Sequence, residues 1–472
     1  MGSEMCIRDR TSAPEAIHFS PMSYPQNLTV SPDQVQPLFA RHINAIGMMP
    51  IVLDVANSQG VLLLDERTGT PYLDFFGFYA TSTLGMNHPK LVSDDNFLAR
   101  LRQAALNKIT NSDVQTGLMA RFLRTFGRFA QPGSLPYAFF VAGGTLAVEN
   151  ALKTAFDWKV RKNFAKGYTR ELGHQVLHLQ EAFHGRSGYT LSLTNTADPV
   201  KTMYFPKFDW PRILNPKITF PLNEHLDTVR ELEKTALSQA KEHFHARKDD
   251  IACILLETIQ GEGGDNHFRP EFLQALKDLC LDNDALLIFD EVQCGAGVTG
   301  TYWAWEQLGV KPDIVAFGKK TQVCGILAGQ RLDEVDEHVF VKPSRINSTW
   351  GGNLVDMVRY DRVLEVMQED NLLAHTRKAG NHLLARLQGL ENEVPGVLNA
   401  RGRGLMCAID ISSRDLRDET LRACIRRGLI MLGCGQSTIR FRPPLIITER
   451  EIDAGIDLLR DILVSQEKAM AA

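Results

Sequence analysis

Two carboxylates and one amine follow apolar runs of the chain, where their side chains could act in catalysis. Glu257 and Asp290 come directly after residues 252–256 and 285–289, and Lys319 follows residues 314–317 after one glycine. Burial of a lysine amine disfavours its charged form, which makes the amine a nucleophile suited to forming a Schiff base. A lysine at the end of an apolar run can also mark the return of the chain to solvent. The elements around these residues therefore decide between the two interpretations.

Apolar runs and helical segments alternate along this part of the chain. The apolar runs predict buried strands, and helices are predicted between them at 146–156, 271–281 and 303–308. Such alternation is typical of a mostly parallel sheet with helices on both faces. Ligands of these sheets bind at the carboxyl ends of the strands. We therefore expect the two carboxylates and the amine to lie together at one edge of the sheet.

A glycine pair stands between another predicted strand and its helix, in the sequence Phe139-Phe140-Val141-Ala142-Gly143-Gly144-Thr145. The N-terminus of a helix is suited to binding a phosphate, because backbone N–H groups and the helix dipole point there. An ordinary strand–helix turn has the same pattern, so this motif is weak evidence when it is taken alone.

The composition gives no indication of nucleic acid or membrane binding. The 472 residues carry a formal net charge of -4, and basic and acidic residues are interleaved. No apolar run has transmembrane length. The eight cysteines include no CxxC pair, which favours reduced thiols in a cytoplasmic protein. His243 and His245 lack acidic or cysteine partners at ligand spacing, so no metal site is predicted.

The predicted elements indicate a large and a small α/β domain. Residues 1–30 begin with a sequence, MGSEMCIRDR, that fits no pattern, and we expect this segment to be disordered or artefactual. Residues 31–88 are assigned to the N-terminal part of the small domain, and residues 89–353 to the large domain. Residues 354–472, where helices and strands alternate again, are assigned to the C-terminal part of the small domain.

Four stretches of the sequence together resemble the class III aminotransferases, which carry pyridoxal phosphate (PLP). The resemblance extends from about residue 34 to residue 463. It implies fold type I of the PLP-dependent transferases, the aspartate aminotransferase-like fold. Within the family, the stretches are most similar to those of the lysine 6-transaminase branch. They are Gly143–Asn150, Phe183–Tyr189, Gly318–Gly325 and Asn347–Asn353.

The resemblance implies roles for residues around the cofactor ring. Lys319 matches the Schiff-base lysine, and Lys320 would be a surface lysine or one behind the site. Members of the family more often have a single lysine followed by a glycine pair, so the Lys-Lys pair is a departure. Asp290 would keep the pyridine nitrogen protonated, so that the ring can accept electrons from the substrate carbon. Gln293 would contact the 3-oxygen of the ring.

Further residues are implied to hold the phosphate and the ring face. Gly144 and Thr145 would bind the phosphate, although most of the family has a Ser-Gly pair where this chain has Gly143 and Gly144. Phe183 would stack on the flat ring, or it could be a phenylalanine of the hydrophobic core. Thr349 would reach the phosphate from the neighbouring subunit, which implies a homodimer with shared active sites.

Two arginines are implied to bind substrate carboxylates, because a guanidinium group binds a carboxylate bidentately. Arg440 matches the carboxylate-binding arginine of the family, and Arg186 would bind the far carboxylate. Glu262 is assigned to the catalytic residues as well as to the substrate site. It would pair with Arg440 when an ε-amine without an adjacent carboxylate occupies the site. An unpaired arginine facing an apolar chain would be costly. Asn347 is also assigned to the substrate site.

The resemblance implies transfer of the ε-amino group of L-lysine to 2-oxoglutarate, which gives 2-aminoadipate 6-semialdehyde and L-glutamate. The freed Lys319 would act first as general base and then as general acid. One alternative is another class III ω-aminotransferase that acts on 4-aminobutyrate or ornithine. A decarboxylase or aminomutase on the same fold is a further alternative. A non-catalytic protein with this fold is disfavoured by the presence of Lys319 and Asp290.

Overall fold

A computed structural model describes residues 29–43 and 48–471. The chain divides into two compact units, Met1–Val52 with Glu66–Thr68, and Leu53–Asp65 with Gly69–Ala472. The first unit contains helix α1 (Pro32–His42). Most of the predicted segment 1–30 lies outside the described residues. All features described below belong to the second unit.

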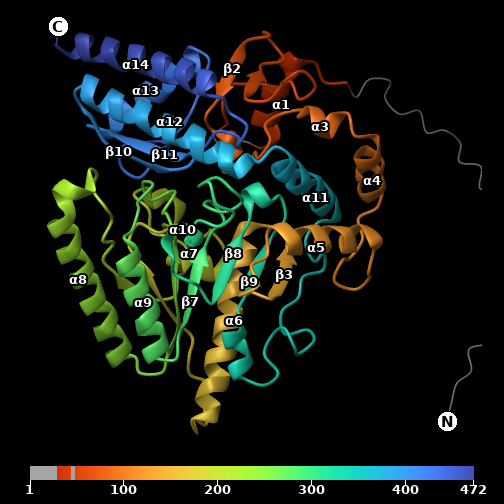
Figure 1. Cartoon of the computed structure of the whole chain (residues 1–472), viewed down its shortest axis with the longest axis vertical. Helices are drawn as coiled ribbons and strands as arrows, with labels where there is room; N and C mark the ends of the chain where they lie inside the picture. Colours follow the sequence, from red (N-terminus) through yellow and green to blue (C-terminus); the bar gives the residue numbers. More distant parts are fainter. Residues whose placement is uncertain (1–28, 44–47, 472) are drawn as a thin grey trace, which may run out of the picture. The chain divides into compact units, whose positions relative to one another are not determined.

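The second unit is built around a seven-stranded sheet (Figure 1). From β8 to β5 every neighbouring pair of strands is parallel, whereas β9 runs antiparallel to both β3 and β8. The prediction of a mostly parallel sheet is therefore confirmed, although the short β5 and the glycine-containing β9 are not among the predicted strands. The strand order is β3 (Tyr137–Val141), β9 (Cys324–Ala328), β8 (Ile314–Phe317), β7 (Leu286–Asp290), β6 (Ile251–Glu257), β4 (Gln175–Leu179) and β5 (Arg212–Ile213).

Helices pack on both faces of this sheet, because the side chains of each strand alternate between two hydrophobic cores. In one core, Trp158 of α6 (Gly144–Ala165) packs with residues of β4, β6, β7 and β8. In the other, Phe126 and Leu276 pack from α5 (Gly117–Phe129) and α9 (Pro270–Asp282). The other helical segments of this part are α2 (Gly77–Ala80), α3 (Pro89–Val92), α4 (Asp95–Leu106), α7 (Gly188–Leu193), η1 (Pro199–Lys201), α8 (Leu222–Ala246), α10 (Trp305–Leu308), η2 (Lys319–Thr321), η3 (Gln330–Glu334) and α11 (Leu354–Glu369).

The strand register brings together the three residues from which the sequence analysis starts. Glu257 and Asp290 are the last residues of β6 and β7, and they lie opposite each other in the parallel pair. Asp290 is in turn opposite Ala316 of β8, and Lys319 follows β8 after a single glycine. All three residues therefore lie at the carboxyl ends of parallel strands, as predicted.

Two smaller sheets are formed by the N-terminal and C-terminal parts of the unit. In one, the antiparallel pair of β1 (Leu62–Leu64) and β2 (Pro71–Asp74) continues into β12 (Leu429–Ile430), which lies parallel to β2. The other has the order β10 (Val397–Arg403), β11 (Met406–Ile411), β14 (Thr438–Phe441) and β13 (Leu432–Cys434). Helices α12 (Leu372–Glu393) and α13 (Arg414–Arg426) contact this second sheet, and α14 (Glu449–Ala471) packs against both helices (Figure 1). No helix in the described part of the chain could cross a membrane.

Candidate active site

A cavity of about 210 Å³ lies at the carboxyl ends of the central strands. All the predicted cofactor-binding residues of the described chain except Thr349 line it. The lining residues are Gly144, Thr145, Phe183, His184, Gly185, Glu257, Asp290, Val292, Gln293 and Lys319.

The two adjacent lysines after β8 have different surroundings. Lys319 lines the cavity, and burial together with Arg440 and Arg442 lowers the pKa of its amine to about 8. Lys320 is 1% exposed, its Nζ donates to the carbonyl oxygen of Ser82, and burial lowers its pKa to about 7. The expectation of a surface position for Lys320 is wrong, whereas a position behind the site agrees with the structure. Lys319 is the better candidate for the Schiff-base residue, because its side chain lines the cavity.

Asp290 is held by two polar contacts. Its Oδ2 lies 2.8 Å from Nδ1 of His184, and its Oδ1 accepts the backbone N–H of Val292 at 3.0 Å. Asp290 and His184 are 4% and 3% exposed. The sequence analysis assigns no role to His184, although it stands within the stretch Phe183–Tyr189. The contact joins the segment after β4 to the end of β7, so only the folded chain reveals it.

Glu257 is a second buried carboxylate in the cavity wall. It accepts the backbone N–H of Phe183 at 3.0 Å and that of Gly261 at 2.9 Å. Burial raises the pKa of its carboxyl to about 7. Glu257 therefore holds the backbone of Phe183 in place at the cavity.

The start of α6 closes the cavity at another side. Gly143 has a φ of 116°, in the region that favours glycine, and precedes the first turn of this 22-residue helix. A Cβ at Gly144 would lie 2.8 Å from a side-chain methyl of Val292, so the close approach to the segment after β7 requires glycine. The free N–H groups of the helix and the Thr145 hydroxyl suit an anion here.

Glu262 lies between two cationic side chains. Its Oε2 is 2.7 Å from the Arg440 guanidinium, and its Oε1 contacts Nζ of Lys201. Burial raises the pKa of the Glu262 carboxyl, but Arg440 and Lys201 together hold it below its ordinary value. The predicted pairing of Glu262 with Arg440 is present in the structure. Lys201 is not among the predicted site residues, because the contact links η1 to a loop some 60 residues later.

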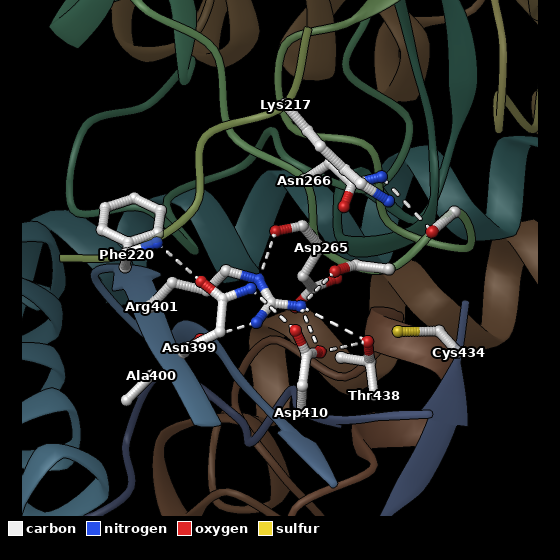
Figure 2. Close-up of polar contacts among 12 residues, drawn as sticks. Lys217, Phe220, Asp265, Asn266, Asn399, Ala400, Arg401, Asp410, Cys434 and Thr438 are labelled. Carbon is white, nitrogen blue, oxygen red and sulfur yellow. Dashed lines mark hydrogen bonds and ion pairs between the residues drawn. The ribbon is translucent and has the colours of Figure 1, made fainter. Parts of the chain in front are cut away.

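The loop that carries Glu262 is anchored through its backbone. The buried guanidinium of Arg401 donates to the carbonyl oxygens of Gly264 and Asp265 at 2.5 and 3.0 Å (Figure 2). The carbonyl oxygen of Glu262 accepts the N–H of Gly435 at 2.9 Å. These contacts fix the loop against the sheet of β10, β11, β14 and β13.

A further arginine connects this loop to the cavity. Arg442 forms an ion pair with Asp265 and donates to Oε1 of Gln293 at 3.3 Å. Arg440 also lies 3.4 Å from the same oxygen. Gln293 thus contacts both arginines from the cavity wall. Its predicted contact with the cofactor's 3-oxygen stays a prediction.

Three predicted site residues lie on the surface of the described chain. Arg186, Asn347 and Thr349 are exposed, and none of them is among the residues that line the cavity. For Thr349 this position agrees with the expectation that it completes the site of a neighbouring subunit.

The family model described as aminotransferase class-III matches residues 43–463. The chain therefore belongs to the class III aminotransferases, and it is a PLP-dependent enzyme of that class.

Several proteins to which this chain is similar are named lysine aminotransferases. The L-lysine-epsilon aminotransferase of Mycobacterium tuberculosis is 55% identical over 92% of this chain and 96% of the relative. That of Amycolatopsis lactamdurans is 52% identical over 92% of this chain and 96% of the relative. A solved structure titled lysine aminotransferase from M. tuberculosis in the internal aldimine form is 55% identical, with a TM-score of 0.90 over 92% of this chain and all of that one. The predicted fold type is therefore confirmed.

The residues of the cavity fit pyridoxal phosphate. The start of α6 suits its phosphate, the buried Asp290 suits a protonated ring nitrogen, and Lys319 offers an amine of lowered pKa. Phe183 offers an aromatic face to a flat ring.

Proposed function

We propose that this chain transfers the ε-amino group of L-lysine to 2-oxoglutarate, giving 2-aminoadipate 6-semialdehyde and L-glutamate. The observation that carries the proposal is the ion pair between Glu262 and Arg440 beside the cavity. It is the arrangement expected of a site that must accept a reacting carbon with or without an adjacent carboxylate.

The two half-reactions present different groups to Arg440. The ε-carbon of lysine has no carboxylate attached, so the guanidinium, whose side chain is 4% exposed, would face an apolar chain. A buried charge without a partner is strongly unfavourable, and Glu262 neutralises it. The α-carbon of glutamate carries a carboxylate that replaces Glu262 as the partner of the guanidinium. Glu262 must then move aside. Arg186 holds the far carboxylate of either substrate.

Each wall of the cavity has a part in the chemistry. The cofactor, when bound, supplies an electron sink for the charge that develops on the substrate carbon. Lys319 takes the proton from that carbon and later returns one, for which a pKa of about 8 is suited near neutral pH. Asp290 stabilises positive charge at the ring nitrogen, and Gly144 and Thr145 bind the phosphate.

The names of relatives support lysine over other ω-amines. Proteins named L-lysine-epsilon aminotransferase are 51 to 55% identical to this chain. Those named 4-aminobutyrate aminotransferase, from Caenorhabditis elegans and Homo sapiens, are 32% and 27% identical. A 4-aminobutyrate specificity is therefore the alternative that the experiment must exclude.

Separate half-reactions test the proposal. The PLP-loaded enzyme is mixed with L-lysine, ornithine or 4-aminobutyrate alone, and loss of the visible cofactor band is followed. We expect rapid loss with L-lysine only, and recovery of the band on addition of 2-oxoglutarate. Rapid loss with another amine and none with L-lysine would overturn the proposed donor. Failure of 2-oxoglutarate to restore the band would overturn the proposed acceptor.

We also propose a cytoplasmic homodimer in which Thr349 completes the neighbouring site. The exposure of Asn347 and Thr349 supports this arrangement. Refolding a mixture of Lys319→Ala and Thr349→Ala chains tests it, because one site of each hybrid dimer then has both native residues. Activity well above that of either variant is expected. No gain over Thr349→Ala alone, in a sample that light scattering shows to be dimeric, would mean that Thr349 acts within its own chain.

A further inference from the structure

The carboxylate of Glu262 is shared by two cations that lie on different elements. One oxygen contacts the guanidinium of Arg440 in β14, and the other contacts Nζ of Lys201 in η1. The side chains of Arg440, Glu262 and Lys201 are 4%, 20% and 23% exposed. The lysine is therefore the more exposed of the two partners, and the arginine lies deeper.

The backbone beneath Glu262 has little freedom to move. Its carbonyl oxygen is bonded to Gly435, and the next residues of the loop are held by the buried Arg401 (Figure 2). The Arg401 guanidinium is itself ion-paired with Asp410 at 2.8 Å. Release of Arg440 must therefore come from rotation of the Glu262 side chain rather than from displacement of the loop.

We propose that Lys201 holds Glu262 when Arg440 is released to bind the α-carboxylate of the second substrate. This inference rests on the proposed function, and it makes Lys201 a positioning residue that sets the balance between the two half-reactions. With Lys201 present, a rotated Glu262 keeps one cationic partner in a largely buried place. Without Lys201, rotation would leave the carboxylate with none, which is costly for a buried charge.

The effect of losing Lys201 is therefore selective. When Glu262 pairs with Arg440, the carboxylate retains a partner whether or not Lys201 is present. When Glu262 has rotated away, it depends on Lys201. Removal of Lys201 raises the free energy of the rotated state more than that of the paired state. The glutamate half-reaction needs the rotated state, and the lysine half-reaction needs the paired one.

One other carboxylate faces Lys201. Asp198, on the same short segment, lies 3.7 Å from Nζ, which is beyond hydrogen-bond distance. Glu262 is therefore the nearer partner of the amine. The Asp198 side chain is 38% exposed and is solvated whether or not Lys201 is present.

The test is the variant Lys201→Met, which keeps most of the side-chain length and removes the charge. In the PLP-loaded enzyme, we expect kcat/KM of the L-glutamate half-reaction to fall about tenfold to a hundredfold, the equivalent of one charge-assisted hydrogen bond. The L-lysine half-reaction should change much less. Lys201→Arg, which retains the charge, should restore most of the glutamate rate. Equal losses in the two half-reactions would overturn the proposal.

Lys207→Met is the matched control on the same segment. Its Nζ donates to the backbone carbonyl oxygens of Thr202 and Phe205 rather than to Glu262. A variant that merely loosens the segment should therefore resemble Lys207→Met and leave the ratio of the two half-reactions unchanged. The same change of ratio in Lys207→Met as in Lys201→Met would overturn the proposal.

Equilibrium binding gives a second readout that does not depend on turnover. Glutarate, a dicarboxylate without an amine, should require the rotated Glu262 to reach Arg440. Calorimetry should show weaker glutarate binding in Lys201→Met, and no further weakening when Lys201→Met is added to Glu262→Ala. Equal weakening in both backgrounds would overturn the role of Lys201. Failure of L-lysine to react with the unaltered enzyme would overturn the proposed function alone, and this cycle would still decide the role of Lys201.

Discussion

The two ends of the candidate active site are built in different ways. At the cofactor end, Asp290 and Glu257 stand at the ends of neighbouring strands, and backbone N–H groups hold both carboxylates. At the substrate end, one carboxylate, Glu262, is shared between Arg440 and Lys201, which come from separate elements. The cofactor end has one arrangement of partners, whereas the substrate end has a choice between two. Under the proposed function, the chemistry that both half-reactions share is thus separated from the recognition of two different substrates.

The largest effect is expected at the cofactor end, from Lys319→Ala. Lys319 is the proposed Schiff-base residue and proton carrier, so loss of its amine should lower kcat of the lysine reaction by at least about 1,000-fold. Borohydride reduction followed by mass spectrometry should then find no cofactor attached to the chain. Lys320→Met is the matched control, because its amine contacts the backbone of Ser82. Attachment lost in Lys320→Met and kept in Lys319→Ala would reverse the assignment.

Asp290→Asn should have the next largest effect. The amide has nearly the same shape as the carboxylate but no charge to stabilise a protonated ring nitrogen. We expect kcat to fall about 100- to 1,000-fold for both half-reactions, comparable to the loss of one preorganised electrostatic contact. Rapid-mixing absorbance measurements with L-lysine and with L-glutamate check this. A loss confined to one substrate would place Asp290 in substrate recognition instead.

The contrast between the cofactor end and the substrate end explains which parts of the site the sequence could predict. The cofactor end lies on regular strands, so apolar runs at 285–289 and 314–317 were enough to bring Asp290 and Lys319 to one edge of a sheet. The contact of His184 with Asp290 depends on how the segment after β4 folds back, which no local pattern encodes. The contact of Lys201 with Glu262 depends in the same way on packing between distant segments. The pairing of Glu262 with Arg440 is implied by the family resemblance, because no periodicity of the sequence indicates it.

Glu262→Ala tests the substrate end and should have a smaller, selective effect. Without the carboxylate, Arg440 has no partner when lysine occupies the site, whereas the α-carboxylate of glutamate still supplies one. The lysine half-reaction should therefore fall about tenfold to a hundredfold more than the glutamate half-reaction. Stopped-flow measurement of each half-reaction gives the ratio. Equal losses would mean that Glu262 does not distinguish the two substrates, and the contrast between the two ends would disappear.

The smallest effect expected is on the pH dependence of cofactor attachment, and it tests whether the two ends influence each other. Burial, Arg440 and Arg442 lower the pKa of Lys319 to about 8, so its amine is mostly protonated and unreactive below that pH. The rate at which the apoenzyme binds PLP covalently should rise about fivefold between pH 7 and 8 and level off above about pH 9. An ordinary lysine would give a rate that keeps rising to about pH 10.

Glu262 affects this pH dependence, because its negative charge raises the pKa of Lys319. Removal of that charge in Glu262→Gln should therefore move the midpoint to lower pH, so that more of the amine is neutral at pH 7. Glu337→Gln, at an exposed site where the carboxylate pairs with Lys342, is the matched control and should leave the midpoint unchanged. A midpoint that stays the same in Glu262→Gln would show that the charge of Glu262 does not change the pKa of the Lys319 amine. A lower midpoint would mean that the charge of Glu262 at the substrate end raises the pKa of the Lys319 amine at the cofactor end.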